Sequence, residues 1–334
     1  MKVEILTRRD FCRLSLLVGF AGLTGCGRSI SKPILRAASE TLPKELLRAL
    51  PDPWFFSALE TKAGLKPSQL VVNSSADLLA IGDGWLSEFS KEVLLPIEAG
   101  QISSRLDKKA QEFINSFGLE ISSRIFPIGV SPWVMLFRNG QDFLPRAQKG
   151  WDVLLDPVLA GSIVLPESPR LVISIADRME GTHALIRLRK QALTFDDRNG
   201  LNWVLSGRAR VAILPLFRCF GSLSRDPRLS VAFPESGAPL NWTVLVRPSS
   251  SKQPFPLAWM EEAWSMPLLG KLLARGWVPP LPHEELRQII RYIPDKYKTI
   301  LLPPESVWFK SWSLSSLPEV ELNRLESIWK ESTP

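Results

Sequence analysis

Histidine is scarce in this chain, and that scarcity removes most routes to catalysis and to metal binding. The 334 residues contain two histidines, His183 and His283, and neither has a metal-ligand spacing or a neighbouring cysteine pair. A zinc or copper site needs such ligands, so we predict no metal site and no cofactor. The Gly-x-Gly-x-x-Gly and Gly-x-Ser-x-Gly patterns of common enzyme classes are also missing. We therefore expect a protein that is not an enzyme.

Long apolar runs are missing as well. The apolar stretch near the start of the chain covers residues 14–23, about ten residues, whereas a helix that crosses a bilayer needs roughly 20. A basic stretch that contains Arg8 and Arg9 precedes this run, and Cys26 follows it. That order is typical of an export signal and not of a folded domain. We predict that residues 1–25 are removed.

Two sequence motifs in this segment indicate a particular export route and a lipid anchor. Its Thr-Arg-Arg-Asp-Phe sequence around Arg8 and Arg9 resembles the twin-arginine consensus, which implies that the chain is exported already folded. Leu-Thr-Gly before Cys26 resembles the bacterial lipobox, which implies cleavage before a lipidated cysteine and an anchor of several acyl chains. An ordinary signal peptide with a chance cysteine is the alternative. Since Cys12 leaves with the signal, Cys219 would be the remaining thiol, and no intramolecular disulfide is possible.

Length and charge bound the mature chain. Removal of the signal leaves 309 residues, which favours two domains or lobes at about 150 residues per domain. The formal charge falls from +7 to +5, because the removed segment carries four basic and two acidic residues. This mild basicity comes without the dense Lys/Arg stripe of a nucleic-acid-binding protein, so we expect no nucleic acid as a partner.

Hydrophobic patterning alternates between strand-like and helix-like segments, which indicates an α/β protein. The clearest break is Gly82-Asp83-Gly84, where an apolar strand ends and a helix is expected to follow. Strands are predicted at residues 76–81, 124–137, 161–166, 209–214 and 240–246, and helices at 257–277 and 318–329.

Several segments, taken in order, resemble one known family. Residues 150–166 match the pattern W-x-x-L-x-D-P-x-x-x-G-x-I-x-L-P. Further similar segments lie at residues 76–86, 202–209, 233–242 and 276–280. Together they resemble the spermidine/putrescine-type periplasmic solute-binding proteins of ABC transporters, over about residues 41–330.

This resemblance implies a type II, two-lobed periplasmic-binding-protein-like fold with two crossover strands as hinge. Residues 26–39 would be a tether, residues 40–128 with 249–334 the first lobe, and residues 129–248 the second lobe. The implied protein is a lipid-anchored monomer on the periplasmic side of the membrane. It would bind a small-molecule solute in the cleft between its lobes and deliver it to an ABC transporter permease.

Ligands of such folds gather at strand ends and at the interface between lobes. The residues predicted there are Asp83, Trp85, Trp133, Arg170, Asn241, Trp242 and Thr243. Each has an alternative role: Trp133 and Trp242 could be packing residues, Asp83 a helix cap, and Arg170 part of an ion pair.

The resemblance weakens at the positions that would bind a polyamine. A diammonium solute needs carboxylates, but the corresponding positions carry Ser168, Leu171 and Thr243. The aromatic pair expected before the first helix falls on Ala38 and Thr41. Because an unpaired buried ammonium costs several kcal/mol, spermidine and putrescine are not expected to bind tightly.

Two other functions stay open from the sequence. An exported enzyme is one, although the carboxylate pair at Asp196 and Asp197 is interpreted as solvated turn residues. An envelope lipoprotein that uses the same fold as a scaffold or for a protein partner is the other, and it would not close around a solute.

Overall fold

The computed structural model describes residues 32–59, 71, 74–291 and 293–333, and the chain from Pro33 onward forms one compact unit. Arg8, Arg9 and Cys26 lie outside the described residues. Within the described part, no helix is both long and apolar enough to cross a membrane.

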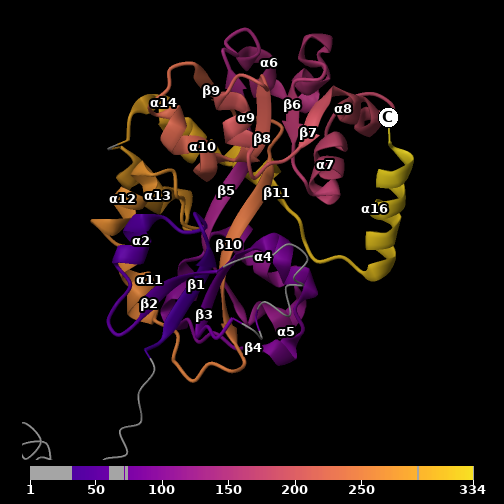
Figure 1. The fold of residues 1–334 in the computed structure, drawn as a ribbon. Coiled ribbons are helices and arrows are strands. Elements are labelled where there is room, and N and C mark those ends of the chain that lie inside the picture. The colour runs from indigo at the N-terminus through magenta and orange to yellow at the C-terminus, as the bar shows by residue number, and fades with distance from the viewer. Residues whose placement is uncertain (1–31, 60–70, 72–73, 292, 334) are drawn as a thin grey trace, which may run out of the picture. The chain divides into compact units, whose positions relative to one another are not determined.

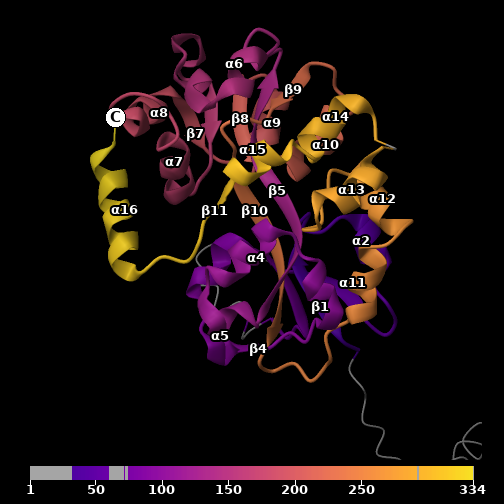
Figure 2. The ribbon, with the colours of Figure 1, turned by 180° about the vertical axis from the view of Figure 1, so that it is seen from behind.

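The described strands form one mixed sheet with helices packed around it (Figures 1 and 2). The order along its main path is β2-β1-β3-β10-β5-β8-β6-β7, with β4 and β11 paired to β10 and β9 paired to β5. The strands are β1 (Ile34–Ala38), β2 (Phe55–Leu59), β3 (Leu78–Gly82), β4 (Leu94–Leu95), β5 (Ile125–Arg138), β6 (Ile163–Leu165), β7 (Ala192–Phe195), β8 (Val211–Pro215), β9 (Leu229–Ala232), β10 (Pro239–Pro248) and β11 (Trp312–Ser313).

Helices connect most of these strands, and the chain after β10 is mainly helical. The α-helices are α2 (Lys44–Arg48), α4 (Lys108–Asn115), α5 (Gly118–Ser122), α6 (Leu144–Lys149), α7 (Pro169–Ala176), α8 (Ala184–Gln191), α9 (Gly200–Leu205), α10 (Leu216–Leu223), α11 (Leu257–Ala263), α12 (Leu268–Ala274), α13 (His283–Ile290), α14 (Asp295–Leu301), α15 (Glu305–Lys310) and α16 (Glu319–Glu331). The 3₁₀ helices are η1 (Asp83–Glu88), η2 (Lys91–Val93), η3 (Gly100–Arg105), η4 (Trp151–Leu155) and η5 (Pro157–Leu159).

Proline sets where many of these helices begin. Pro43, Pro282, Pro294, Pro304 and Pro318 each stand immediately before a helix, with φ between −51° and −64° and ψ between 136° and 151°. The ring fixes φ near this value and proline has no N–H to leave unpaired at a helix start. The high proline content therefore determines helix boundaries in the last third of the chain.

Two long strands, β5 and β10, run through the middle of the sheet. Residues 125–132 of β5 pair with β10, and residues 133–137 of β5 pair with β8. We call the strands β1 to β4 with residues 125–132 of β5 the β3 half, and β6 to β9 with residues 133–138 of β5 the β6 half. The extended runs predicted at 124–137 and 240–246 are confirmed. The lobe boundaries stay a prediction.

The predicted tether ends earlier than expected. Residues 34–38 of the range 26–39 form β1, which pairs in parallel with both β2 and β3. Leu35 and Ala37 are 0% exposed. Their alternation with half-buried Ile34, Arg36 and Ala38 is the mark of a strand, but five residues directly after a polar stretch give a weak signal.

Two hydrophobic clusters stabilise the sheet, one confined largely to the β6 half and a larger one that extends across both halves. Trp151, Ile163 and Ile213 belong to the cluster of the β6 half, while Leu78 and Trp259 belong to the larger cluster that includes the β3 half. Burial of these side chains is the main stabilising term of such a fold.

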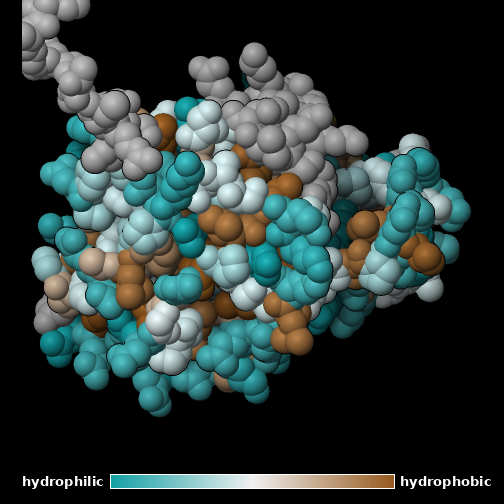
Figure 3. Space-filling view, turned by 90° about the horizontal axis from the view of Figure 1, so that it is seen from below, coloured by the Kyte–Doolittle hydropathy of each residue, from teal (hydrophilic) through white to brown (hydrophobic). Residues whose placement is uncertain are grey.

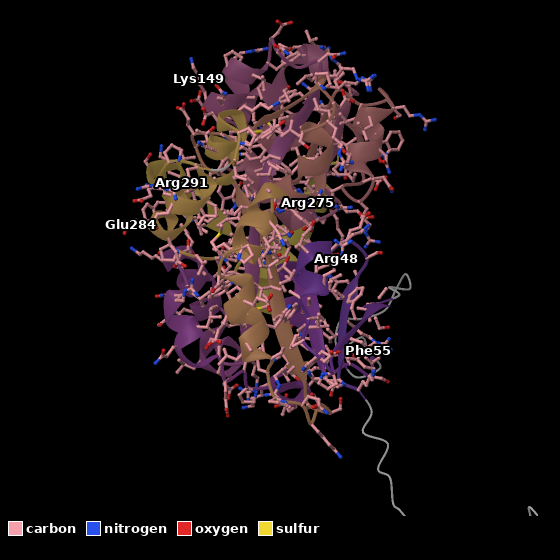
Figure 4. The ribbon with its side chains drawn as sticks, turned by 90° about the vertical axis from the view of Figure 1, so that its left-hand side faces the viewer. Arg48, Phe55, Lys149, Arg275, Glu284 and Arg291 are labelled. Carbon is pink, nitrogen blue, oxygen red and sulfur yellow. The ribbon has the colours of Figure 1, made fainter. Side chains whose placement is uncertain are left out.

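Helices from distant parts of the chain complete the larger cluster. The indole Nε1 of Trp259 in α11 donates to the carbonyl oxygen of Leu46 in α2 at 3.0 Å, and Arg275 pairs with Glu45 at 2.7 Å. Figure 4 shows Arg48 and Arg275 close together where α2 and α12 pack. The C-terminal third therefore covers the first helix of the described chain.

Candidate functional site

Two adjoining cavities, of about 580 and 740 Å³, lie where strand ends of both halves meet. Strands β3 and β1 of one half are parallel to each other, and β6 is parallel to β7 and β8 in the other. Residues that follow the carboxyl ends of all five strands line the cavities, which is the usual place of ligand sites in such sheets. The residues that line both cavities are Gly82, Trp85, Trp133, Asp197, Arg198 and Asn241.

Asp83 lies at the end of β3, as the first residue of η1. Strand β3 ends with Gly82 opposite Thr243 in an antiparallel pair, so the next residue, Asp83, lies beside Trp242. The Asp83 carboxylate accepts a hydrogen bond from the backbone N–H of Trp242. Burial raises the pKa of Asp83 to about 7, although backbone N–H donors and the charge of Arg170 act in the opposite direction. At neutral pH this carboxyl group can therefore both donate and accept a proton.

Arg170 faces the same end of the first cavity from the other half. It is the second residue of α7, whose N-cap Ser168 accepts a hydrogen bond from the N–H of Leu171 at 3.4 Å. Burial lowers the pKa of Arg170, while the charge of Asp83 raises it, and a guanidinium remains charged under such conditions. Its Nη2 donates to the carbonyl oxygen of Ser315.

Aromatic side chains form the wall between the cavities. Trp85 and Trp133 are half-buried and line both. In the second cavity Phe217 meets Trp277 edge to face, with centroids 5.1 Å apart. Trp277 lies so close to β5 that a Cβ on Gly129 would come within 2.2 Å of its ring, so glycine is required there. These faces can contact an apolar or planar part of a solute.

Side chains of a strand alternate between the two faces of the sheet, so the three predicted site residues of β10 do not all point to the cavities. Asn241 and Thr243 are half-buried and line cavities, whereas Trp242 points to the opposite face. Its side chain is 0% exposed, stacks on Phe113 at 4.7 Å and donates to Ser313 Oγ at 2.8 Å. Trp242 lines neither cavity, so we assign it to the core and not to the site.

Ion pairs occupy much of the remaining charged lining, whereas Glu40, which lines the second cavity, is exposed. Arg198 pairs with Glu167 at 3.7 Å, and Arg218 pairs with Asp197 at 3.6 Å. Asp197 also accepts a hydrogen bond from the N–H of Glu167 at 2.9 Å. The sequence analysis interpreted Asp197 as a solvated turn residue and so missed its place in the cavity lining. Its position two residues after the strand β7, whose end lies next to that of β6, was the feature of the sequence that could have indicated this.

The positions where a polyamine site would need other residues do line the cavities. Ser168 and Leu171 lie in the first cavity, and Ala38, Thr41 and Thr243 lie in the second. The two halves therefore bring together the residues that the resemblance aligned with ligand positions, and none of the five is acidic or aromatic.

Comparison of the structure with solved structures identifies the fold, whereas comparison of the sequence finds no match. No protein-family model matches the chain, and no curated protein matches its sequence. The spermidine/putrescine ABC transporter substrate-binding protein PotD of Streptococcus pneumoniae matches with a TM-score of 0.63 and 11% identity, over 90% of this chain and 98% of that chain. The fold is that of a two-lobed periplasmic solute-binding protein.

Two further solved structures, a second PotD and a binding protein in complex with another ligand, are similar to this chain. The PotD lipoprotein of Treponema pallidum matches with a TM-score of 0.63 and 11% identity, over 90% and 99% of the two chains. AgtB of Agrobacterium tumefaciens, in complex with agropinic acid, matches with a TM-score of 0.58 and 14% identity, over 90% and 98%. At these identities the likeness establishes the fold, and the choice of solute depends on the side chains of the cleft.

Proposed function

We propose that this protein is a solute-binding lipoprotein of an ABC importer and that its solute binds in the two adjoining cavities. The observation that carries the proposal is the convergence of five strand ends on a cleft lined by half-buried indole rings and a half-buried arginine. A concave site that combines aromatic faces with polar groups is typical of small-molecule binding. The ligand-binding residues that we propose are Asp83, Trp85, Trp133, Arg170, Asn241 and Thr243.

The charges of the cleft argue against a polyamine as the solute. Glu167 and Asp197 are already paired with arginines, and Asp83 faces Arg170 and has a raised pKa. At Asp83, Glu167 or Asp197 a diammonium would have to compete with a guanidinium, at the cost of its own hydration. Glu40 of the second cavity is exposed and could bind one end of such a solute. A neutral or zwitterionic solute with an apolar or planar part suits the lining better.

The proposed export route and anchor come from the first 26 residues. Arg8 and Arg9 would direct the folded chain through the twin-arginine route, and Cys26 would carry the lipid that holds it at the periplasmic face of the membrane. Residues 40–128 with 249–334 and residues 129–248 would be the two lobes. Closure about β5 and β10 would signal occupancy to a permease.

A thermal-shift screen tests the proposal. Polyamines, amino acids, organic acids, sugars and metal chelates would each be added to the purified protein. A true ligand at 100 times its dissociation constant should stabilise the folded state by about 2.7 kcal/mol. We expect a shift with one class other than polyamines.

Matched variants locate the binding. Trp133→Ala should abolish the shift, whereas Trp54→Ala should keep it, because Trp54 is also half-buried but lines neither cavity. A shift with micromolar spermidine would overturn the reading of the cleft charges. No shift with any compound would favour the scaffold function.

A further inference from the structure

The C-terminal segment passes along the cleft before it ends on the β6 half. It starts at β11, which pairs with the first residues of β10, and continues through an extended stretch into α16. Figures 1 and 2 both show α16, in yellow, beside α7 and α8, after a connection that descends from β11 toward α4. Residues 314–331 therefore lie across one side of the first cavity.

Four residues of this segment form part of the cavity wall. They are Leu314, Ser315, Ser316 and Leu322. The carbonyl oxygen of Ser315 accepts a hydrogen bond from Arg170, so the segment binds a group that a solute would use. Asp83 and Trp85 of the β3 half line the same cavity.

The attachment of α16 to the β6 half is concentrated at one end. Trp329 packs edge to face on Phe195 at 5.4 Å, and the guanidinium of Arg189 lies 3.8 Å from the centre of the Trp329 ring. Arg189 also donates to the Trp329 carbonyl oxygen and, at 2.6 Å, to Ser332 Oγ. Trp329 is thus a specific side-chain attachment of α16 outside the main core, in addition to the packing of the helix against α7.

The remainder of α16 is weakly held. No residue within the helix is buried, and Val320 and Leu322 are 81% and 40% exposed. Seen from below, the right-hand end of the molecule, where α16 lies in Figure 1, shows hydrophilic residues with apolar ones between them (Figure 3). An element with few buried apolar contacts opens at low cost compared with the core.

We propose that residues 314–331 form a C-terminal lid over the Asp83–Arg170 end of the first cavity, and that the lid opens when Trp329 leaves Arg189 and Phe195. Opening releases Arg170 from Ser315 and widens access to the cavity for larger molecules. This inference is independent of the identity of the solute, and it holds whether or not the cleft binds one.

Cysteine labelling in the full-length chain tests the lid. Gly84→Cys places a thiol in the lining of the first cavity, at an exposed position where a Cβ meets no atom within 4 Å. Ser39→Cys is the matched control, because Ser39 is likewise exposed but lines the second cavity alone. Native Cys219 is buried, and burial raises the pKa of its thiol to about 12, so it should not react. Peptide mass spectrometry would count each cysteine separately.

The readout is the rate of labelling by a polyethylene-glycol maleimide divided by the rate with N-ethylmaleimide. Adding Trp329→Ala should raise this ratio at Gly84→Cys by about tenfold, as expected for the loss of a cation–π and an aromatic contact. The ratio at Ser39→Cys should not change. Trp329→Phe, which keeps a ring against Arg189 and Phe195, should restore most of the closed behaviour.

A second variant shortens a lid side chain that lines the cavity and leaves the Trp329 contacts unchanged. Leu322→Ala shortens a side chain that lines the cavity, and it should also raise the ratio at Gly84→Cys. An unchanged ratio in both the Trp329→Ala and Leu322→Ala chains would overturn the proposal. So would an equal rise at Ser39→Cys, because the whole protein would then have loosened.

Discussion

Replacing Trp242 by alanine should destabilise the protein strongly and should not act through the solute site. The side chain is 0% exposed, stacks on Phe113 with an interplanar angle of 13° and donates one hydrogen bond to Ser313. Truncation of a buried tryptophan costs about 3–5 kcal/mol, and the lost stacking and hydrogen bond place Trp242→Ala near the upper end of that range. Trp242→Phe keeps the ring contact and should cost about 1–2 kcal/mol.

Urea unfolding followed by far-ultraviolet circular dichroism measures these differences. The slope of the transition should stay constant, so that the shift in midpoint reports stability. Trp133→Ala is the matched control, and because Trp133 lines the cavities and is half-buried, it should cost less than about 2 kcal/mol. A Trp242→Ala protein within about 1 kcal/mol of the wild type would refute the core assignment.

Four further predictions follow from the charged groups and the signal. As pH rises from about 4 to 7, the unfolded chain loses the Asp83 proton while the folded chain keeps it. The stability of the wild type should therefore fall relative to that of Asp83→Asn over this range and level off above about pH 7. A difference in melting temperature between the two proteins that is constant with pH would contradict this. Burial lowers the pKa of His283 from 6.5 to about 4, so the unfolded chain binds a proton that the folded chain excludes and stability should fall between these values on acidification. His283→Phe should reduce that loss in acid-unfolding curves. Cys26→Ala should release the protein from the membrane fraction, and a variant that still pellets would count against the lipobox. Replacing Arg8 and Arg9 by lysine should stop export, as followed by cell fractionation, since an ammonium does not mimic the planar guanidinium pair.

The central strands could be predicted because their sequences carry strong local signals. Residues 125–138 and 239–248 are long extended runs that are mostly buried, and burial on both faces produces an almost continuous apolar pattern. β1 gave no such signal, since five residues after a polar stretch resemble a tether. The helix expected after Gly84 is the 3₁₀ helix η1, a difference that periodicity does not resolve in six residues.

The site could be predicted in part, and the limits are geometric. Strand alternation alone separates Asn241 and Thr243 from Trp242, and applying it would have removed the tryptophan from the site. Asp197 became a lining residue because the ends of β6 and β7 lie side by side, which depends on long-range pairing. The attachment of α16 to α8 and β7 depends on Trp329 meeting Arg189 and Phe195, which are distant in the sequence.

Native mass spectrometry of the protein purified from its own membrane tests the solute-binding function most directly. We expect a fraction of the chain to carry one copurified small molecule, with a mass different from spermidine and putrescine. That adduct should disappear when Trp85 and Trp133 are both changed to alanine. It should persist with Phe55→Ala, since Phe55 (labelled in Figure 4) is exposed on the edge strand β2 and lines neither cavity. A bare chain in every preparation, or an adduct that survives the double tryptophan change, would contradict the proposed cleft.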